Sequence, residues 1–339
     1  MVRALAEAQG RRGFRVRAEA RRRGEEIFTR RRGDAEIKRS RRSRFPIERP
    51  DQAASLRVEG GFAAVFSFSA SPRLRANPKS SAPRREPNRM STIAPPTPKQ
   101  EEWRYADFAA LKTLAPERFD EWETVELAPG ETRRECLVLK GSAPELHRIR
   151  LVVGKGARAE LFAVNAGGDY ARLEVQVHLA EGAHFQFGGV TIGGGEATRE
   201  FVTRTVHAEP GATSDQVVRA VHWGQATGNF LGRIDVARAA QKTDAAQDFR
   251  ALLLERGASA NTKPELEIFA DDVKCAHGAA IGQMDEAARF YMAARGLPPE
   301  AARALLVRAF IADAFAALDD AGEQERLLDA ALAVLEERA

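Results

Sequence analysis

Between residues 124 and 270 the chain alternates short apolar runs with turns that contain glycine. The runs are HRIRLVV, ARAELFAV, ARLEVQVHL, HFQFGGVTI and EFVTRTVHA. They are rich in β-branched residues and have either a period of two or a continuous apolar core, as in strands buried on one or both faces. The pattern predicts a mainly β fold for this part of the chain.

A Gly-Ala signal returns between these runs, at steps of 26, 29, 46 and 21 residues. The glycines are Gly156, Gly182, Gly211, Gly257 and Gly278. A loose repeat of this length predicts a β-solenoid, in which each coil buries its inner face against neighbouring coils. A β-sandwich is the competing arrangement, but the Asn-Gly and Asp-Gly turns that join tight hairpins are absent here. A solenoid leaves open sheet edges, which must be capped or paired with another chain.

Helical patterns flank the predicted solenoid. The segment from Glu101 contains Trp103, Tyr105 and Phe108 as expected core anchors, and its helix is predicted to end near Pro116. We therefore assign residues 90–123 to an N-terminal helical segment, 124–283 to the solenoid and 284–339 to a C-terminal helical domain.

The C-terminal domain shows clear helix signals. Asp285 is the predicted N-cap of EAARFYMAAR, Gly296 ends that helix, and Pro298 opens PPEAARALLVRAFIADAFAAL, which is followed by EQERLLDAALAVLEER. The second helix has a broad apolar surface, formed by Val307, Phe310, Ile311, Ala314, Phe315 and Leu318. So broad a surface on a terminal helix indicates a partner as much as a core.

Residues 1–89 have a different composition, with 24 Lys and Arg against 10 Asp and Glu. They show no sustained apolar period, so we expect a disordered leader. A nucleic-acid-binding arm, a transit peptide and a basic membrane-surface segment are possible functions of such a leader. We favour a simpler explanation, in which translation begins at Met90 and the preceding residues come from a mis-assigned start.

Hydropathy, cysteine content and the absence of common motifs limit the classes of protein to which the chain can belong. No apolar run reaches the length that a membrane span needs, and two cysteines do not make a disulfide framework, so the expected compartment is the cytoplasm. The sequence contains no Walker, GxGxxG, HExxH or paired CxxC motif. It therefore gives no local support for an NTPase, a dinucleotide enzyme or a structural zinc site.

The stretch ADDVKCAHGAAIGQ holds the most distinctive chemistry, Cys275 and His277. On a strand the two side chains point to the same face, with Cα atoms about 7 Å apart. Lys274 and a protonated His277 would lower the thiol pKa. Three interpretations stay open: a packed structural cysteine, a pair of shared metal ligands, and a Cys-His nucleophile. As metal ligands the pair is incomplete, because an iron–sulfur or zinc centre takes about four.

The run from Gly232 to Phe310, above all NTKPELEIFADDVKCAHGAAIGQ, closely resembles the SufD branch of the SufB/SufD family of iron–sulfur cluster assembly proteins. EEWRYADF and TSDQVVRAVHWGQATGNFLG also resemble that family, so the resemblance covers roughly Glu101 to Leu318. It implies a right-handed parallel β-helix flanked by helices. The N-terminal region is shorter than is usual in the family, and the cluster-ligand cysteines typical of SufB are missing, which favours SufD.

The resemblance also implies a function. It implies a non-catalytic scaffold subunit that pairs with SufB through β-helix edges and binds the ATPase SufC through its C-terminal helices, with a homodimer possible when SufB is absent. The chain itself would bind no nucleotide, nucleic acid or membrane. His277 and Cys275 would hold a transient iron–sulfur cluster shared with SufB. The candidate SufC-facing residues are Phe290, Tyr291, Phe310, Ile311 and Phe315. The alternative is an independent enzyme that uses Cys275 and His277.

Overall fold

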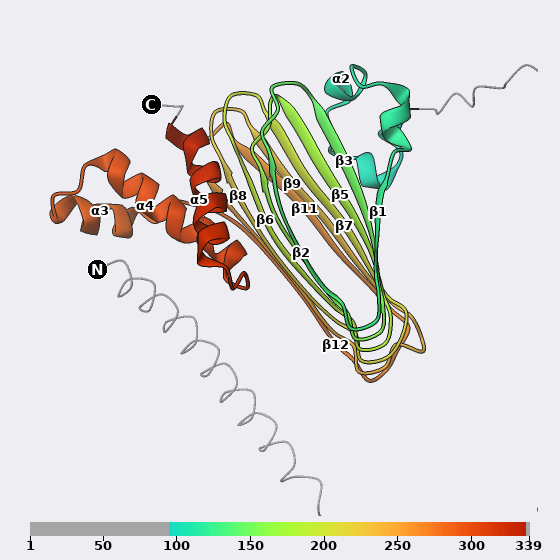
Figure 1. Ribbon diagram of the computed structural model, residues 1–339. Coiled ribbons are helices and arrows are strands. Elements are labelled where there is room, and N and C mark those ends of the chain that lie inside the picture. The colour runs from blue at the N-terminus through green and yellow to red at the C-terminus, as the bar shows by residue number, and fades with distance from the viewer. Residues whose placement is uncertain (1–94, 337–339) are drawn as a thin grey trace, which may run out of the picture. The chain divides into compact units, whose positions relative to one another are not determined.

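The computed structural model describes residues 95–336 (Figure 1). The predicted leader and the proposed start at Met90 lie outside the described residues. The described part contains two six-stranded sheets in which every pairing is parallel. Successive strands alternate between the sheets, so each coil contributes one strand to each sheet. This is a parallel β-solenoid, as the sequence pattern predicts.

The first sheet consists of the odd-numbered strands, β1 (Glu123–Leu127), β3 (Glu145–Val153), β5 (Tyr170–Leu179), β7 (Thr198–His207), β9 (Thr227–Val236) and β11 (Ser259–Ile268). The second sheet consists of the even-numbered strands, β2 (Thr132–Leu139), β4 (Arg158–Asn165), β6 (His184–Gly193), β8 (Thr213–His222), β10 (Asp244–Leu253) and β12 (Lys274–Gln283). The five apolar runs quoted above correspond to β3 to β7.

The coils lengthen along the chain. Paired residues are 26 apart between β1 and β3, where Glu123 meets Ile149, and 32 apart between β9 and β11, where Ser259 meets Thr227. The loose spacing of the sequence repeat has this origin. Because the strands stay in register, side chains at paired positions form ladders that run the length of the solenoid.

One corner of the solenoid has a left-handed backbone in successive coils before the last. Gly156, Gly182 and Gly211 supply it with φ values of 64°, 63° and 73°, and Lys242 takes the same place in the next coil with φ 64°. The predicted continuation of this column to Gly257 and Gly278 is wrong. Gly257 belongs to the turn after β10, and Gly278 lies inside β12. The step of 46 residues therefore spans two different corners.

Apart from charged residues at the mouth of the first coil, the solenoid interior is apolar in its early coils and becomes more polar toward the C-terminal end. Valine and leucine side chains fill the early coils, and phenylalanines pack in the middle, where Phe187 meets Phe201 edge to face with ring centroids 5.4 Å apart. Later coils bury Gln216, His222 and Gln247 among them. This core is the face that the alternating sequence pattern identifies.

The C-terminal helices are α3 (Glu286–Ala294), α4 (Pro299–Ala312), the 3-10 turn η3 (Asp313–Phe315) and α5 (Ala321–Glu336). Among them, α4, η3 and α5 cover the outer face of the second sheet, while α3 projects away from it (Figure 1). Asp285 caps α3 by accepting hydrogen bonds from the amides of Ala287 and Ala288, and Gly296 follows with φ 80°. The caps are those that the sequence predicts, whereas the second helix breaks into η3 before its expected end.

This packing corrects part of the predicted partner surface. Ile311 and Phe315 are 0% and 1% exposed, and the Phe315 ring packs edge to face on Phe162 of β4. The two side chains are buried because the outer face of the second sheet is itself apolar and needs a cover. They belong to this chain's own core, and Phe310 is half-buried against the same cluster.

The N-terminal segment covers the outer face of the first sheet. It consists of η1 (Glu101–Trp103), α2 (Phe108–Leu111) and η2 (Pro116–Phe119), so the predicted single helix is three short pieces and Pro116 begins one of them. Trp103 is buried, as predicted, and lies over the buried Arg172 guanidinium at 3.8 Å from ring centroid to Cζ. Arg172 in turn donates to the buried Glu200. This cation–π and ion-pair stack fixes the segment to the sheet.

Candidate functional site

The last coil of the solenoid ends in an open sheet edge. β12 pairs with β10 on one side, and no strand among residues 95–336 pairs with its other side. Three of the seven large hydrophobic side chains exposed in the described residues belong to this coil and its end, namely Ile268, Phe269 and Ile281. An unpaired edge with exposed apolar side chains is a template for pairing with another chain.

Cys275 and His277 lie on this edge strand. In the register, Cys275 pairs with Ala245 and His277 with Gln247, and both of those residues point into the solenoid and are buried. Paired residues of a parallel sheet share a face, so Cys275 and His277 also point to the inner side. Because no further coil covers them, His277 is exposed and Cys275 is half-buried. The predicted shared face of the two residues thus follows from the strand.

The Cys275 thiol is not activated in this chain alone. It packs beside an apolar cluster that includes Ala237 and Leu266. Burial raises its pKa above the ordinary value, and the Asp244 carboxylate raises it further. The sequence-based expectation that Lys274 and His277 lower this pKa is therefore wrong. A thiol with a raised pKa is a poor nucleophile near neutral pH.

The pair does not form a complete metal site within the described residues. No three His, Cys, Asp or Glu side chains gather there to hold an ion. Asp272, a possible third ligand by sequence position, instead forms an ion pair with Lys242. The strand thus offers one sulfur and one imidazole nitrogen, donors that suit iron, zinc and copper. Any tetrahedral centre at this edge needs further ligands from outside the described residues.

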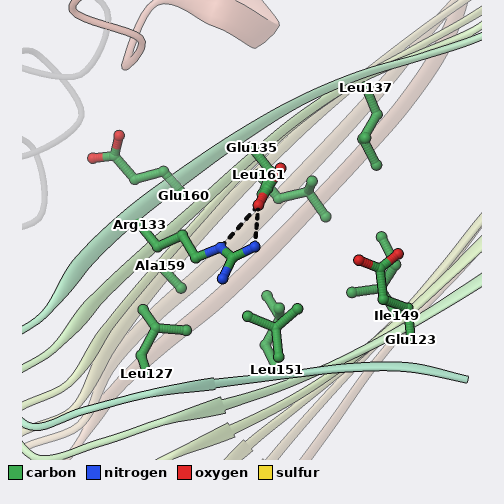
Figure 2. A pocket seen from close by; sticks show the side chains of 11 residues that line it. Glu123, Leu127, Arg133, Glu135, Leu137, Ile149, Leu151, Ala159, Glu160 and Leu161 are labelled. Carbon is green, nitrogen blue, oxygen red and sulfur yellow. Dashed lines mark hydrogen bonds and ion pairs between the residues drawn. The ribbon is translucent and has the colours of Figure 1, made fainter.

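The opposite end of the solenoid is built differently. Glu123 on β1 and Arg133 and Glu135 on β2 occupy inward positions of the first coil, and Figure 2 shows Arg133 and Glu135, two residues apart on the same strand, directed at each other. Arg133 and Glu135 are joined at 2.8 Å. Inward-pointing charges at a sheet edge oppose pairing with another strand. The inward positions of β12 carry no such charge, so the two ends differ in their capacity to pair.

The other edge of the last coil is also blunted. β11 contains Pro264, which lacks a backbone N–H and is tolerated only where no ladder hydrogen bond is needed. Lys263 beside it forms ion pairs with Glu265 and, from the N-terminal segment, Glu101 at 2.9 and 2.8 Å. Of the two strands in the last coil, β12 is the one without a proline.

A second exposed surface lies on the C-terminal helices. α3 buries none of its residues, and Phe290 and Tyr291 are 78% and 52% exposed. Arg295 stacks on the Tyr291 ring at 4.8 Å. Both aromatic side chains are exposed, unlike Ile311 and Phe315, and their role as a partner surface stays a prediction.

Sequence reasoning missed a group of polar residues that link the helices to the sheet. Arg219 on β8 is 2% exposed and contacts the carboxylates of Asp248 on β10 and Asp313 on η3. Asp248 and Asp313 follow Arg219 by 29 and 94 positions in the sequence, so no local motif joins the three residues. The only sequence signal is an arginine among the apolar residues of VVRAV in β8.

Comparison with known proteins was consistent with these features. Residues 138–310 match the family model described as SUF system FeS cluster assembly, SufBD core domain. The chain is 36% identical over 175 residues to an iron–sulfur cluster assembly SufBD family protein of Synechocystis, and 42% identical over 99 residues to the iron–sulfur cluster assembly protein SufD of Escherichia coli. It is 30% identical over 139 residues to the SufD of Bacillus subtilis.

The matched regions are parts of longer proteins. They cover 51%, 29% and 41% of this chain, and 39%, 23% and 32% of those relatives, respectively. No helix among the described residues is long and apolar enough to cross a membrane.

Proposed function

Because the chain belongs to the SufBD core-domain family of the SUF iron–sulfur cluster assembly system, we propose that it is a SufD-like scaffold subunit. In this role it pairs with a SufB-type subunit through β12 and supports cluster assembly between the two chains. The observation that carries the proposal is the unpaired edge of β12, whose inward positions include Cys275 and His277 and no Asp, Glu, Lys or Arg.

The cluster is the cargo of this reaction, and the chain supplies half of its binding site. His277 is exposed on the open coil, where an imidazole nitrogen can reach iron without rearrangement. Cys275 has a raised pKa, so it binds iron only after a metal displaces its proton. His277 is therefore the first ligand and Cys275 the second, and the remaining ligands come from the SufB-type partner.

The ATPase partner is assigned to α3 and the exposed side of α4. A SufC-type subunit would cover Phe290 and Tyr291, whose side chains are largely exposed on α3. The nucleotide belongs to that subunit, and the chain acts without catalysing a reaction of its own. The domain limits 90–123, 124–283 and 284–339 are the units in which we expect these roles to be divided.

Co-expression with SufB-type and SufC-type partners tests the proposal. We expect the full chain to co-purify with both, and His277→Ala to retain the complex but lose most of its iron and sulfide. Ile281→Lys places an inward charge on β12, and it is expected to release the SufB-type partner. Val152→Lys is its matched control, because Val152 is an exposed apolar residue of a central strand, 39% exposed against 49% for Ile281.

Two outcomes would overturn the proposal. One is normal cluster content in the His277→Ala complex together with full partner binding by Ile281→Lys. The other is Cys275-dependent burst kinetics of the purified chain on an ester or thioester, which would favour the independent enzyme.

A further inference from the structure

The Arg219 guanidinium is a fully satisfied junction between three elements. Nε and Nη2 donate to Asp313 Oδ2 of η3, Nη2 also donates to Asp248 Oδ2 of β10 at 2.7 Å, and Nη1 donates to the carbonyl oxygens of Val218 and Asp248 at 2.8 and 3.1 Å. These contacts use all five N–H donors of the side chain.

Asp248 extends the junction toward the site. In the register it pairs with Gly278 of β12, the residue directly after His277. A Cβ at position 278 would lie 3.2 Å from Asp248 Oδ1, so the carboxylate lies directly beside this part of the edge strand. Arg250 also contacts Asp248, at 3.2 Å, and balances the second acidic charge.

Asp313 extends it toward the helices. It is the C-cap of α4 and the first residue of η3, and the carbonyl of Ala314 lies so close to β6 that a Cβ on Gly188 would meet it at 2.1 Å. α3 follows β12 after only Met284 and Asp285. The α3–α4 pair is therefore attached at both ends, covalently to β12 and through Arg219 to β8 and β10.

We propose that Arg219 is a positioning residue that couples the C-terminal helices to β12, so that a displacement imposed on α3 and α4 reaches the strand carrying His277. The inference rests on the proposed function, in which one partner binds the helices and another binds β12. Without Arg219, Asp313 would lose this ion pair and Asp248 would keep only Arg250, so the polar link between η3 and β10 would be lost while the apolar contacts of Ile311 and Phe315 remain.

The test measures hydrogen exchange of residues 274–283 in the complex with SufB-type and SufC-type partners, with and without a non-hydrolysable ATP analogue. In the unmodified chain, nucleotide is expected to change exchange in both α4 and β12. Arg219→Gln is expected to retain the partners and the α4 response, while the β12 response falls by about two- to thirtyfold. Asp313→Asn removes one charge with less disturbance and is expected to give a smaller loss in the same direction.

Arg172→Gln is the matched control. Arg172 is a fully buried arginine with carboxylate partners, but it lies on the other sheet beneath Trp103. A general loss of stability would affect both variants, whereas coupling predicts that only the Arg219 and Asp313 variants lose the β12 response. An unchanged β12 response in both of those variants, or an equal loss in Arg172→Gln, would overturn the proposal.

Exchange in the full chain without partners separates this proposal from the proposed function. There, Arg219→Gln is expected to raise exchange in residues 313–315 and in β12 together, by about tenfold. If the unmodified chain fails to co-purify with its partners, the proposed function fails, and the free-chain result alone decides the coupling. Increased exchange in η3 with none in β12 would refute it.

Discussion

Replacement of Phe315 by alanine tests whether the C-terminal helices belong to this chain's core. The side chain is 1% exposed and packs on Phe162 with ring centroids 6.5 Å apart. Burial of a phenylalanine removes about 150 to 250 Å² from water. At about 25 cal/mol/Å² that corresponds to about 4 to 6 kcal/mol, close to the 3 to 5 kcal/mol typical of Phe→Ala in a core.

Phe290→Ala is the matched control for this prediction. It makes the same chemical change on α3, where the side chain is 78% exposed, so the expected loss is below about 1 kcal/mol. The assay is urea unfolding of both variants, followed by far-ultraviolet circular dichroism for the helices and by hydrogen exchange for β4 and β6. Phe315→Ala is expected to lower the midpoint by about 1 M or more, given the m-values of proteins of this size.

The variant with the smaller loss of stability, Phe290→Ala, is expected to have the larger effect on partner binding. Phe290→Ala should weaken binding of the SufC-type subunit with little loss of stability. If Phe315→Ala left the unfolding midpoint unchanged, or if Phe290→Ala lowered it as much, the assignment of Phe315 to the core and of Phe290 to the surface would be refuted.

Three further changes test the interior and the corners of the solenoid. Gly232→Ala is expected to destabilise by about 1 to 3 kcal/mol, because its Cβ would lie 2.1 Å from Gln247 Oε1 and 2.7 Å from the Phe230 ring. Lys242→Gly is expected to stabilise by about 0.5 kcal/mol, since φ 64° strains a residue with a side chain and the exposed ion pair that is lost contributes little. His222 is fully buried, and burial lowers its pKa from 6.5 to about 3, so the unfolded chain binds a proton below pH 6.5 that the folded chain rejects until about pH 3. The neutral His222 therefore contributes fully to the free energy of unfolding above pH 6.5. This contribution is lost as the pH falls, and the loss reaches about 3 kcal/mol at pH 4.

Each of these three has a direct measurement. For Gly232→Ala the measurement is chemical unfolding, and a midpoint equal to that of the unmodified chain would contradict the predicted destabilisation. For Lys242→Gly the control is Lys155→Gly, which removes another exposed ion pair at a residue without a positive φ and should not stabilise. For His222 the measurement is the loss of stability between pH 7 and pH 4, which should be smaller in His222→Gln; an identical loss would show that other groups are responsible.

The strands and caps were predictable from sequence because their signals are local. Alternation along β5 or β7 is set by which side chains face the interior, and Asp285 caps α3 within three residues. The repeat period was less reliable. Both corners of the coil use glycine turns, so the sequence did not show that Gly211 and Gly257 belong to different columns.

The environment of the site depended on contacts that no local pattern contains. The pKa of Cys275 is raised through burial against an apolar cluster and through Asp244, which pairs in the register with the adjacent Lys274. The sequence pattern of the apolar stripe that contains Ile311 is the same whether the stripe packs on its own sheet or on a partner. Only the apolar outer face of the second sheet decides between the two.

The difference between the two solenoid ends also bears on how many copies can assemble. A stack with two pairing-competent ends would add subunits head to tail without limit and form a filament. Within residues 95–336, the charges of Glu123, Arg133 and Glu135 oppose strand addition at the first coil, whereas the inward positions of β12 carry no Asp, Glu, Lys or Arg side chain to oppose it. Under the proposed function, assembly through β12 would therefore stop at two solenoids, and the charged first coil would set that limit from the opposite end.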